Sequence, residues 1–444
     1  MVFDQVFRGA TLVTPGGEVK ADLGVVGDRI ADLGDLASAK AETVHDCTGL
    51  HILPGLIDTQ VHFREPGLEH KEDLATGTAG AALGGITAIF EMPNTKPNTD
   101  TAERMADKVR RGRDKAWVDF AFFFGATAEN AAHLGELERL EGCSGVKVFM
   151  GSSTGTLLVD ETEALRAVLA HGTRRIAFHC EDETRLNERM HLVEGGAHVR
   201  MHPQWRDEQT AILATQRILE LAREAQRRIH VLHVTTAEEA KLLEDHKDIA
   251  TMEVTPQHLT LTAEAYEDLG TFAQMNPPIR ESRHRDALWE AVRKGVVDVI
   301  GSDHAPHTRE EKAKPYPKSP SGMPGVQTTV PLMLDAVNAG KLSLMRLVDL
   351  LAHGPQRIYQ INRKGRLVVG YDADLTIVDL KAERTIEESW IASRCGWSPF
   401  TGRKVRGWPV RTVVRGTTVM QDDELIERAA EPVRFLETLR FEDA

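Results

Sequence analysis

The chain has few cysteines, and none of them cluster. Its 444 residues include four, Cys47, Cys143, Cys180 and Cys395, and no two form a CxxC pair. Scattered cysteines supply neither a disulfide framework nor a thiolate metal site, and they suit a reducing compartment. The cytoplasm is therefore the expected location.

Long apolar runs and basic clusters are also missing. Residues 1–8 lack a basic region followed by an apolar core, so we expect no signal peptide. The longest uncharged stretch, 74–90, is rich in glycine and threonine and is too short to cross a bilayer. No segment stands out as rich in lysine and arginine, and the formal net charge is −13. These features predict a soluble protein with neither a membrane nor a nucleic-acid partner.

The chain is too long for one small domain, and both of its ends are rich in short β-runs. Because chain ends often lie near each other, we assign both ends to one discontinuous domain. The β-runs separated by glycine-containing turns are 6–13, 21–26 and 29–33, then 374–379, 411–415 and 417–420. The predicted division is a small flanking β-sandwich domain of residues 1–51 and 365–444 around a central body of residues 52–364.

The central body alternates apolar runs with amphipathic segments, which predicts an α/β fold built as a TIM-type (β/α)8 barrel. The eight apolar runs are 52–62, 86–92, 118–125, 145–150, 175–179, 229–233, 249–255 and 297–301. The amphipathic segments include 99–115, 161–170, 207–226, 237–246 and 281–294.

Polar residues lie at or near the ends of these runs. In a (β/α)8 barrel the active site forms at the carboxyl ends of the strands, so these side chains are expected to converge. In the first run, alternation also places Asp58, Gln60, His62 and Arg64 on one strand face, which is too polar for an ordinary core strand. The predicted site residues are His62, Arg64, Asn94, Lys147, His179, His233, Asn276, Asp303 and His307.

Histidines and carboxylates without cysteines favour zinc or a similar divalent ion. Lys147 is the exception in this set, because a buried ammonium is costly and repels a metal. One alternative is a lysine paired with a carboxylate. The other is a lysine carboxylated by carbon dioxide, which turns the cation into an anionic ligand able to bridge two metals.

Several segments resemble the cyclic amidohydrolases of the amidohydrolase superfamily, and among them most closely the dihydroorotases. The resemblance extends over nearly the whole chain in the right order. The matching segments are 55–58, 61–67, 91–95, 254–256, 276–278, 301–307 and 322–325. It also implies the barrel and the flanking β-domain, independently of the strand pattern.

The resemblance implies roles for the site residues. His62 and Asp303 would bind the more buried of two zinc ions, His179 and His233 the more exposed one, and a carbamate on Lys147 would bridge them. Water activated by the metal would attack the ring amide carbonyl, with Asp303 as general base and then general acid. Arg64, Asn94 and His307 would hold the substrate carboxylate, and Asn276 would contact the pyrimidine ring. For Asn94 and Asn276, turn formation beside proline is the alternative.

Two glutamines depart from the family pattern. Gln60 stands where the family usually has the first histidine of a His-x-His pair, and an amide oxygen is a weaker ligand than imidazole. We therefore expect one tight metal and a second that is weak or absent. Gln257 stands where many relatives have a histidine, which leaves His258 with a supporting or structural role.

The predicted reaction is the reversible hydrolysis of dihydroorotate to N-carbamoyl-aspartate in pyrimidine biosynthesis. Segment 147–150 looks more like hydantoinases and allantoinases, so allantoinase or dihydropyrimidinase/hydantoinase activity is one alternative. A non-catalytic scaffold, partnering an enzyme such as aspartate transcarbamoylase, is the other. The loop 315–324 is expected either to contact substrate or to be a static surface loop. The resemblance also implies a homo-oligomer.

Overall fold

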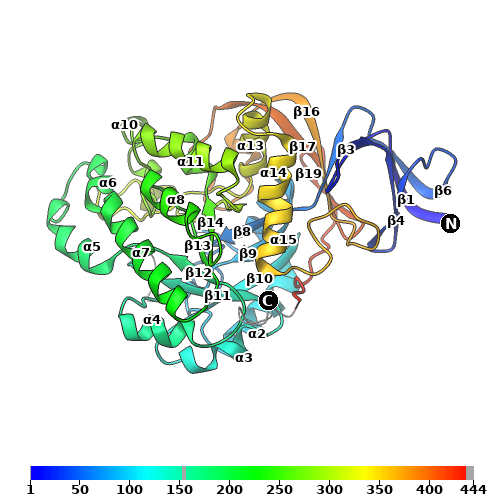
Figure 1. The fold of residues 1–444 in the computed structure, drawn as a ribbon. Helices are drawn as coiled ribbons and strands as arrows, with labels where there is room; N and C mark the ends of the chain where they lie inside the picture. Colours follow the sequence, from blue (N-terminus) through cyan, green and yellow to red (C-terminus); the bar gives the residue numbers. More distant parts are fainter. Residues whose placement is uncertain (1, 153–156, 437–444) are drawn as a thin grey trace.

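The computed structural model describes residues 2–152 and 157–436, and its centre is a barrel of eight parallel strands (Figure 1). Neighbouring strands follow each other in chain order, and helices surround them. The barrel strands are β8 (Leu56–Val61), β9 (Ile86–Glu91), β10 (Asp119–Gly125), β11 (Cys143–Phe149), β12 (Ile176–His179), β13 (Ile229–Val231), β14 (Ala250–Val254) and β15 (Val299–Ile300). The predicted (β/α)8 barrel is confirmed.

Between β15 and β8 the barrel is closed by loop backbone and side chains. The Asp58 carboxylate accepts a hydrogen bond from the Ser302 amide at 3.0 Å, and the Ser302 hydroxyl donates to the Gln60 carbonyl at 3.3 Å. The His62 amide donates to the His304 carbonyl at 2.7 Å. These bonds bring the polar ends of the first and last strands side by side.

Several helices begin at residues whose side chains satisfy a free amide group. Asp207 accepts from the Thr210 amide at the start of α7, and Thr236 forms a capping box with Glu239 at the start of α8. The helices are α1 (Leu74–Leu83), α2 (Ala102–Lys115), α3 (Leu134–Leu137), α4 (Thr162–Leu169), α5 (Glu183–Arg189), α6 (His202–Trp205), α7 (Glu208–Glu224), α8 (Ala237–Glu244), α9 (Pro256–Thr260), α10 (Ala265–Asp268), α11 (Ser282–Lys294), α12 (Arg309–Lys312), α13 (Thr329–Asn338), α14 (Leu344–Val348) and α15 (Gly354–Tyr359). Short 3-10 helices are η1 (Ala131–His133), η2 (Met190–Leu192), η3 (Val199–Met201), η4 (Gly270–Ala273) and η6 (Glu388–Trp390), and η5 (Asp349–His353) is a π-helix.

Two further sheets form the flanking domain, and both chain ends contribute to it. One has four strands, β1 (Val2–Arg8), β4 (Asp22–Val26), β5 (Arg29–Gly34) and β6 (Lys40–Asp46). The other has seven, β2 (Thr11–Thr14), β3 (Gly17–Lys20), β7 (His51–Pro54), β16 (Leu375–Thr385), β17 (Lys404–Val414), β18 (Thr417–Gln421) and β19 (Glu424–Leu425).

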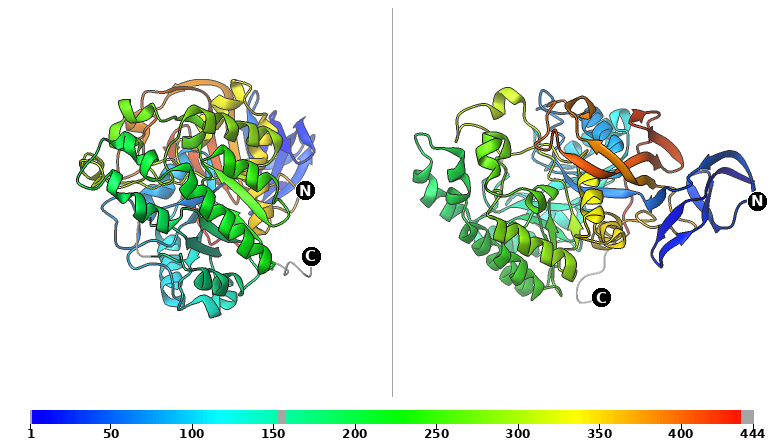
Figure 2. Two further views of the ribbon diagram at one scale, coloured as in Figure 1. Left: turned by 60° about the vertical axis from the view of Figure 1, so that its left-hand side comes forward. Right: turned by 90° about the horizontal axis from the view of Figure 1, so that it is seen from above.

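The four-stranded sheet lies far to one side of the barrel (Figure 2). Apolar side chains from both sheets share one buried cluster, including Phe7 and Leu23 from the first and Ile52 and Leu375 from the second. This cluster is the sandwich core. The seven-stranded sheet also contacts the barrel, where Thr412 donates to the Ala82 carbonyl in α1.

The predicted first barrel run, 52–62, is two strands rather than one. β7 pairs with β16 and β2 in the flanking sheet, whereas β8 begins the barrel. The chain crosses at Gly55, where an added Cβ would lie 2.5 Å from that of Asp374. The end of β7 and the start of β8 (Leu56 and Ile57) form one apolar run, so the sequence pattern alone does not separate them. The predicted domain boundaries at 51/52 and 364/365 stay a prediction.

Within the described residues, no helix combines the length and apolar character needed to cross a membrane.

Candidate active site

Ten residues line a cavity at the carboxyl end of the barrel. They include four of the five predicted metal ligands, His62, His179, His233 and Asp303. Gln60, Phe149, Asn276, Ala305, Ser321 and Gly322 complete its lining. The expected convergence of strand ends is therefore present in the structure.

One part of this site, which we call the inner half-site, consists of Gln60, His62, Lys147 and Asp303. The Gln60 amide nitrogen donates to Asp303 Oδ1 at 3.2 Å, and His62 Nε2 lies 3.2 Å from the same oxygen. His62 Nδ1 donates to Asn94 Oδ1 at 2.7 Å. Asn94 thus orients His62, a contact that the sequence did not predict.

Lys147 reaches the inner half-site from β11 and is 1% exposed. Its Nζ has no hydrogen-bond partner among the described residues and lies 4.3 Å from the centre of the Phe149 ring. Burial lowers the pKa of Lys147 to about 7. Among the described residues Lys147 forms no ion pair with a carboxylate, so the expected alternative of a directly paired lysine has no support there.

The outer half-site consists of His179 and His233 with two supporting residues, Glu181 and Arg206. His179 Nε2 donates to Glu181 Oε2 at 2.8 Å, and His179 Nδ1 lies 3.0 Å from His233 Nε2. Arg206 pairs with Glu181 and also donates to the Ser152 carbonyl. Since Nε2 of His179 carries the proton, its Nδ1 presents a lone pair to the cavity.

Glu181 and Glu253 are buried carboxyl groups with opposite pKa shifts. Burial opposes ionisation of Glu181, but Arg206 and His179 outweigh it and hold its pKa at about 2. Burial, followed by the charge of Asp303, raises the pKa of Glu253 to about 8. Glu253 accepts hydrogen bonds from Thr59, next to Gln60, and from the His233 amide, so it contacts the backbone or neighbours of both half-sites.

A separate group of cations adjoins the inner half-site. The Arg64 guanidinium is 2% exposed, donates to the Pro306 carbonyl at 3.1 Å and lies 3.2 Å from His307 Nε2. The Lys71 ammonium lies 3.1 Å from His307 Nδ1. Among the described residues Arg64 forms no ion pair with a carboxylate. The sequence predicts Arg64 and His307 at this place but not Lys71.

Three predicted site residues have left-handed backbone conformations. The φ angles are 67° for Arg64, 37° for His233 and 44° for Asp303. Such angles are uncommon outside glycine and cost energy, and they cluster at functional sites. They place the three side chains where the strands have ended and the loops begin.

The loop 315–324 covers one side of the cavity. Its Ser321 and Gly322 line the cavity, and the Ser321 carbonyl accepts from His307 Nε2 at 2.9 Å. An added Cβ at Gly322 would lie 2.4 Å from the Ala305 carbonyl oxygen, so glycine allows this close approach. The geometry therefore favours the substrate-contact expectation for this loop over the static one.

Asn276 and the two residues of the expected histidine pair lie at or behind the cavity wall. Asn276 Oδ1 accepts from His202 Nε2 at 3.0 Å. Gln257 donates to the Ser302 carbonyl at 2.8 Å, and His258 lies 2.8 Å from the Thr255 hydroxyl. His258 therefore has the supporting place that the sequence predicts, away from the cavity lining.

A larger cavity, of about 580 Å³, lies at the opposite end of the barrel. Its wall includes Asp119 at the start of β10, and it joins the barrel to the flanking domain. Lys364 pairs with Asp119 and Asp372, and Arg415 pairs with Asp119. These ion pairs connect the two parts of the chain. The smaller cavity is the one that holds the predicted site residues.

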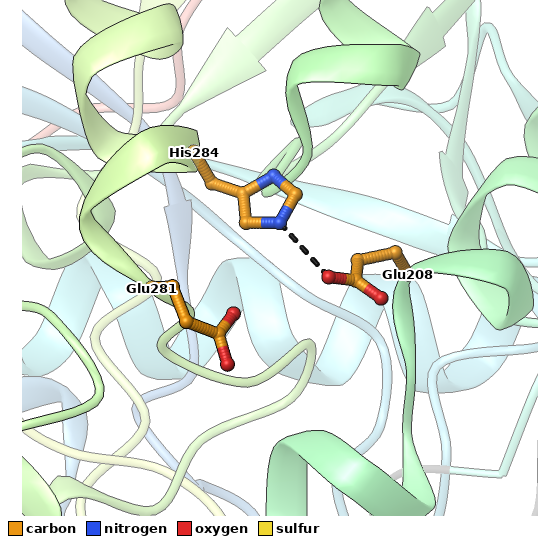
Figure 3. A group of neighbouring side chains, drawn as sticks. All are labelled: Glu208, Glu281 and His284. Atoms are coloured by element: carbon orange, nitrogen blue, oxygen red, sulfur yellow. Dashed lines mark hydrogen bonds and ion pairs between the residues drawn. The ribbon is translucent and has the colours of Figure 1, made fainter.

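Figure 3 shows Glu208, Glu281 and His284, which offer possible metal-ligand atoms that all lie within 4.8 Å of one another. Within the described part of the chain they are the only group of three histidine, cysteine or acidic residues with this property. His284 Nδ1 accepts from the Ala237 amide at 3.1 Å, and its Nε2 donates to Glu208 at 3.0 Å. Both ring nitrogens are therefore engaged. His284 satisfies the first amide of α8, which is a structural role.

Four contact residues were not predicted from sequence. Glu181 and Arg206 orient His179, Glu253 supports His233, and Lys71 contacts His307. The only available signal was for Glu181, which is two residues beyond a predicted ligand at a strand end. The partners of the other three lie far away in the sequence.

Comparison with known proteins gives consistent results. A model of the amidohydrolase family matches residues 51–419. A dihydroorotase of Halobacterium salinarum is 36% identical over 423 residues, which cover 94% of this chain and 97% of the relative. An allantoinase of Deinococcus radiodurans is 34% identical over 441 residues, covering 96% and 97%.

Solved structures show the same architecture. The L-hydantoinase (dihydropyrimidinase) of Arthrobacter aurescens superposes with a TM-score of 0.93 at 30% sequence identity. The match covers 97% of this chain and 99% of that chain. The likeness therefore includes the flanking β-domain as well as the barrel.

Proposed function

The chain belongs to the amidohydrolase family, and we propose that it interconverts dihydroorotate and N-carbamoyl-aspartate. It is a hydrolase of cyclic amides, and relatives named dihydroorotase from several species match most of its length. The observation that carries the substrate assignment is the Arg64 guanidinium, buried beside the cavity without a carboxylate of the protein paired to it. A buried unpaired cation is costly, and a carboxylate on the substrate compensates it.

The polar atoms of the site fit a divalent metal. His62 Nδ1 uses its proton on Asn94, so Nε2 presents a lone pair 3.2 Å from the Asp303 carboxylate. The two acceptors face each other, and a cation between them would interact favourably with both. Gln60 Oε1 and Lys147 Nζ are buried without a hydrogen-bond partner among the described residues. Imidazole and carboxylate donors without thiolates suit zinc.

We assign the ligands by half-site. His179 and His233 would hold one zinc tightly, His62 and Asp303 a second, weaker one, and Lys147 as a carbamate would bridge them. Carbamate formation needs the neutral amine, and the pKa of about 7 leaves a large neutral fraction of Lys147 near neutral pH. When bound, the metal lowers the pKa of water and polarises the amide carbonyl.

The chain's own residues bind substrate and move a proton. Arg64 and His307 hold the carboxylate, and Asn276 at the cavity wall contacts the ring. Asp303 accepts a proton from the attacking water and returns it to the ring nitrogen as the carbon–nitrogen bond breaks. Water thereby adds across the amide, and N-carbamoyl-aspartate is the product. The buried half-sites and the loop 315–324 limit the entry of further water.

The test is turnover of dihydroorotate, allantoin and dihydrouracil with zinc and bicarbonate supplied. We expect hydrolysis of dihydroorotate and loss of activity after chelation. Preferential turnover of allantoin or dihydrouracil would assign the neighbouring activities, and no hydrolysis of any of them would favour a scaffold. Cytoplasmic location and a homo-oligomer complete the proposal. Cys47, Cys143, Cys180 and Cys395 are all free and buried, which suits a reducing compartment.

A further inference from the structure

Lys71 lies in the loop between β8 and α1 and reaches back to the cation group of the active site. Its ammonium is 3.1 Å from His307 Nδ1 and 3.2 Å from Glu311 Oε1. The side chain is 13% exposed. Nothing in the family assignment gives this lysine a role, although it contacts one of the two residues proposed to hold the substrate carboxylate.

The contacts of Lys71 determine which nitrogen of His307 carries the proton. An ammonium only donates hydrogen bonds, so in the 3.1 Å contact with Lys71 it is His307 Nδ1 that accepts. Glu311 Oε2, the carboxylate oxygen that also faces Nδ1, is 3.7 Å away, beyond hydrogen-bond distance. The proton of the neutral ring is then on Nε2, which donates to the Ser321 carbonyl at 2.9 Å. Two independent partners, one on each side of the ring, therefore select the same tautomer.

In this tautomer the contact between His307 and Arg64 is not a hydrogen bond. Arg64 Nη2 lies 3.2 Å from His307 Nε2. A guanidinium also only donates, so the two nitrogens face each other as donors and do not bond to one another. Two adjacent donors, one of them charged, are suited to share the oxygens of one carboxylate.

The charges around His307 favour an anion as well. Besides Arg64 and Lys71, the buried Lys312 ammonium donates to the Gln274 and Pro320 carbonyls, and its charge lowers the pKa of His307 further after the effect of burial. Glu311 is the carboxylate nearest to this group, and it pairs with Lys71. Asp303, Glu91 and Glu72 also act on Arg64 but form no ion pair with it, so a carboxylate of the substrate is a suitable direct partner for its guanidinium.

We propose that Lys71 is a positioning residue that holds His307 as the Nε2–H tautomer and thereby prepares it, beside Arg64, to receive the substrate carboxylate. The inference rests on the proposed function for the identity of the substrate. It assigns Lys71 a part in substrate binding and none in the bond-breaking step.

The kinetic test compares Lys71→Met, Lys71→Arg and a control, Lys314→Met, in the zinc-loaded full-length protein. Methionine keeps the length of the side chain but cannot donate, whereas arginine can. Lys314 is exposed and close in sequence to Glu311, so its replacement removes one charge without touching His307. We expect Lys71→Met to raise KM for dihydroorotate at least tenfold with kcat changed less than threefold. Lys71→Arg should recover most of the loss, and Lys314→Met should resemble the unmodified chain.

An unchanged KM in Lys71→Met, or a fall in kcat without a change in KM, would overturn the proposal. So would an equal effect of Lys314→Met, because that result would show a general effect of charge. A melting temperature measured for each variant separates loss of fold from loss of binding.

A spectroscopic test is independent of turnover. The ring nitrogens of His307 can be assigned in ¹⁵N-histidine spectra as the signals that His307→Asn removes from those of the 18 histidines. We expect protonated Nε2 in the unmodified chain and a mixture of tautomers in Lys71→Met. The same tautomer in both would overturn the proposal. If the chain did not hydrolyse dihydroorotate, the proposed function would fail, while this spectrum would still decide whether Lys71 sets the tautomer.

Discussion

The two half-sites differ in whether the protein places an oppositely charged partner beside their buried charged group. In the outer half-site, Glu181 orients His179, and Arg206 in turn neutralises Glu181. In the inner half-site, Gln60 Oε1 and Lys147 Nζ have no hydrogen-bond partner among the described residues. Among the described residues the outer half-site also has buried atoms without a hydrogen-bond partner, His233 Nδ1, Glu181 Oε1 and Arg206 Nε. Its buried carboxylate nevertheless pairs with a cation of the protein, whereas the buried Lys147 ammonium of the inner half-site pairs with no carboxylate of the described chain.

The pKa values of the two buried glutamates follow the same division. Glu181 beside the outer histidines is kept ionised, with a pKa of about 2. Glu253, which accepts from Thr59 beside Gln60 and from the His233 amide, has a pKa raised to about 8 by burial and by the charge of Asp303. Burial is common to both, so the difference lies in the cation: Arg206 forms an ion pair with Glu181, whereas Lys147 does not offset the burial of Glu253. The comparison predicts different responses of the two half-sites to substitution.

The largest expected effect is on the inner half-site, in the variant Asp303→Asn. The amide keeps the shape of the side chain but cannot accept and return a proton, so we expect kcat to fall by about 10³-fold or more. Steady-state turnover of dihydroorotate measures this loss, and the melting temperature should stay close to that of the unmodified chain. Asp286→Asn on the exposed surface of α11 is the matched control and should be fully active. Activity near normal in Asp303→Asn would remove this residue from the proton-transfer role.

The next effect is on the outer half-site, in the variant Glu181→Gln. The amide oxygen still accepts from His179 Nε2, but the negative charge is gone and Arg206 is left buried without its partner. Partners that orient metal-bound histidines typically contribute 10- to 100-fold to metal affinity, so we expect a loss of about that size. Competition with a chromogenic chelator measures the zinc affinity. Glu188→Gln, which changes an exposed glutamate of α5, should leave it unaltered, and equal affinities in both variants would contradict the role of Glu181.

Local sequence patterns predict part of this structure but not all of it. The eight apolar runs and their polar ends are patterns within short segments, so the barrel and the convergence of His62, His179, His233 and Asp303 follow from the sequence alone. We expect segment 52–62 as one strand from the sequence because β7 and the start of β8 form a single apolar run. Only the pairing of β7 with β16, more than 300 residues away in the sequence, distinguishes them.

Patterns within short segments do not predict the contacts that support the site residues. Arg206 is 25 residues from Glu181, and Lys71 is 236 residues from His307, so no local spacing connects them. Lys147 is intermediate: its place at a strand end was predictable, but its unpaired Nζ and lowered pKa depend on what surrounds it. The direction in which Gln60 points, with its nitrogen on Asp303, also depends on folded neighbours.

A third variant, Gln60→His, makes the inner half-site more like the outer one. It replaces a weak amide ligand with imidazole, so we expect the number of zinc ions that survive dialysis to rise from one to two per chain. Elemental analysis provides the count. Gln257→His is the matched control, because Gln257 is bonded to the Ser302 carbonyl and does not line the cavity, and it should stay at one. Two tightly held zinc ions in the unmodified chain would contradict the predicted weakness of the inner half-site.

The smallest expected effects are on pH-dependent stability, and they should have opposite signs for Glu253 and Glu181. Glu253 keeps its proton in the folded chain up to a pKa of about 8, whereas the unfolded chain loses it near the ordinary glutamate value of about 4.3. Between these pH values the folded state binds more protons, so this group's contribution to stability decreases as pH rises. Glutamine imitates the protonated carboxyl, and Glu253→Gln should therefore gain about 1–3 kcal/mol relative to the unmodified chain between pH 5 and pH 8.

The pH dependence of stability is opposite for Glu181, because its pKa in the folded chain is lowered to about 2. The stability that its ionised form contributes is complete above about pH 4.3 and is lost as pH falls towards 2. Glu181→Gln should be less stable than the unmodified chain at neutral pH, and the gap should close in acid. Urea unfolding of the metal-free proteins across this pH range measures both differences. Parallel pH profiles for the two variants would show that nearby cations do not set the two carboxyl groups apart, and the distinction between an outer half-site with a paired charge and an inner one without would fail with it.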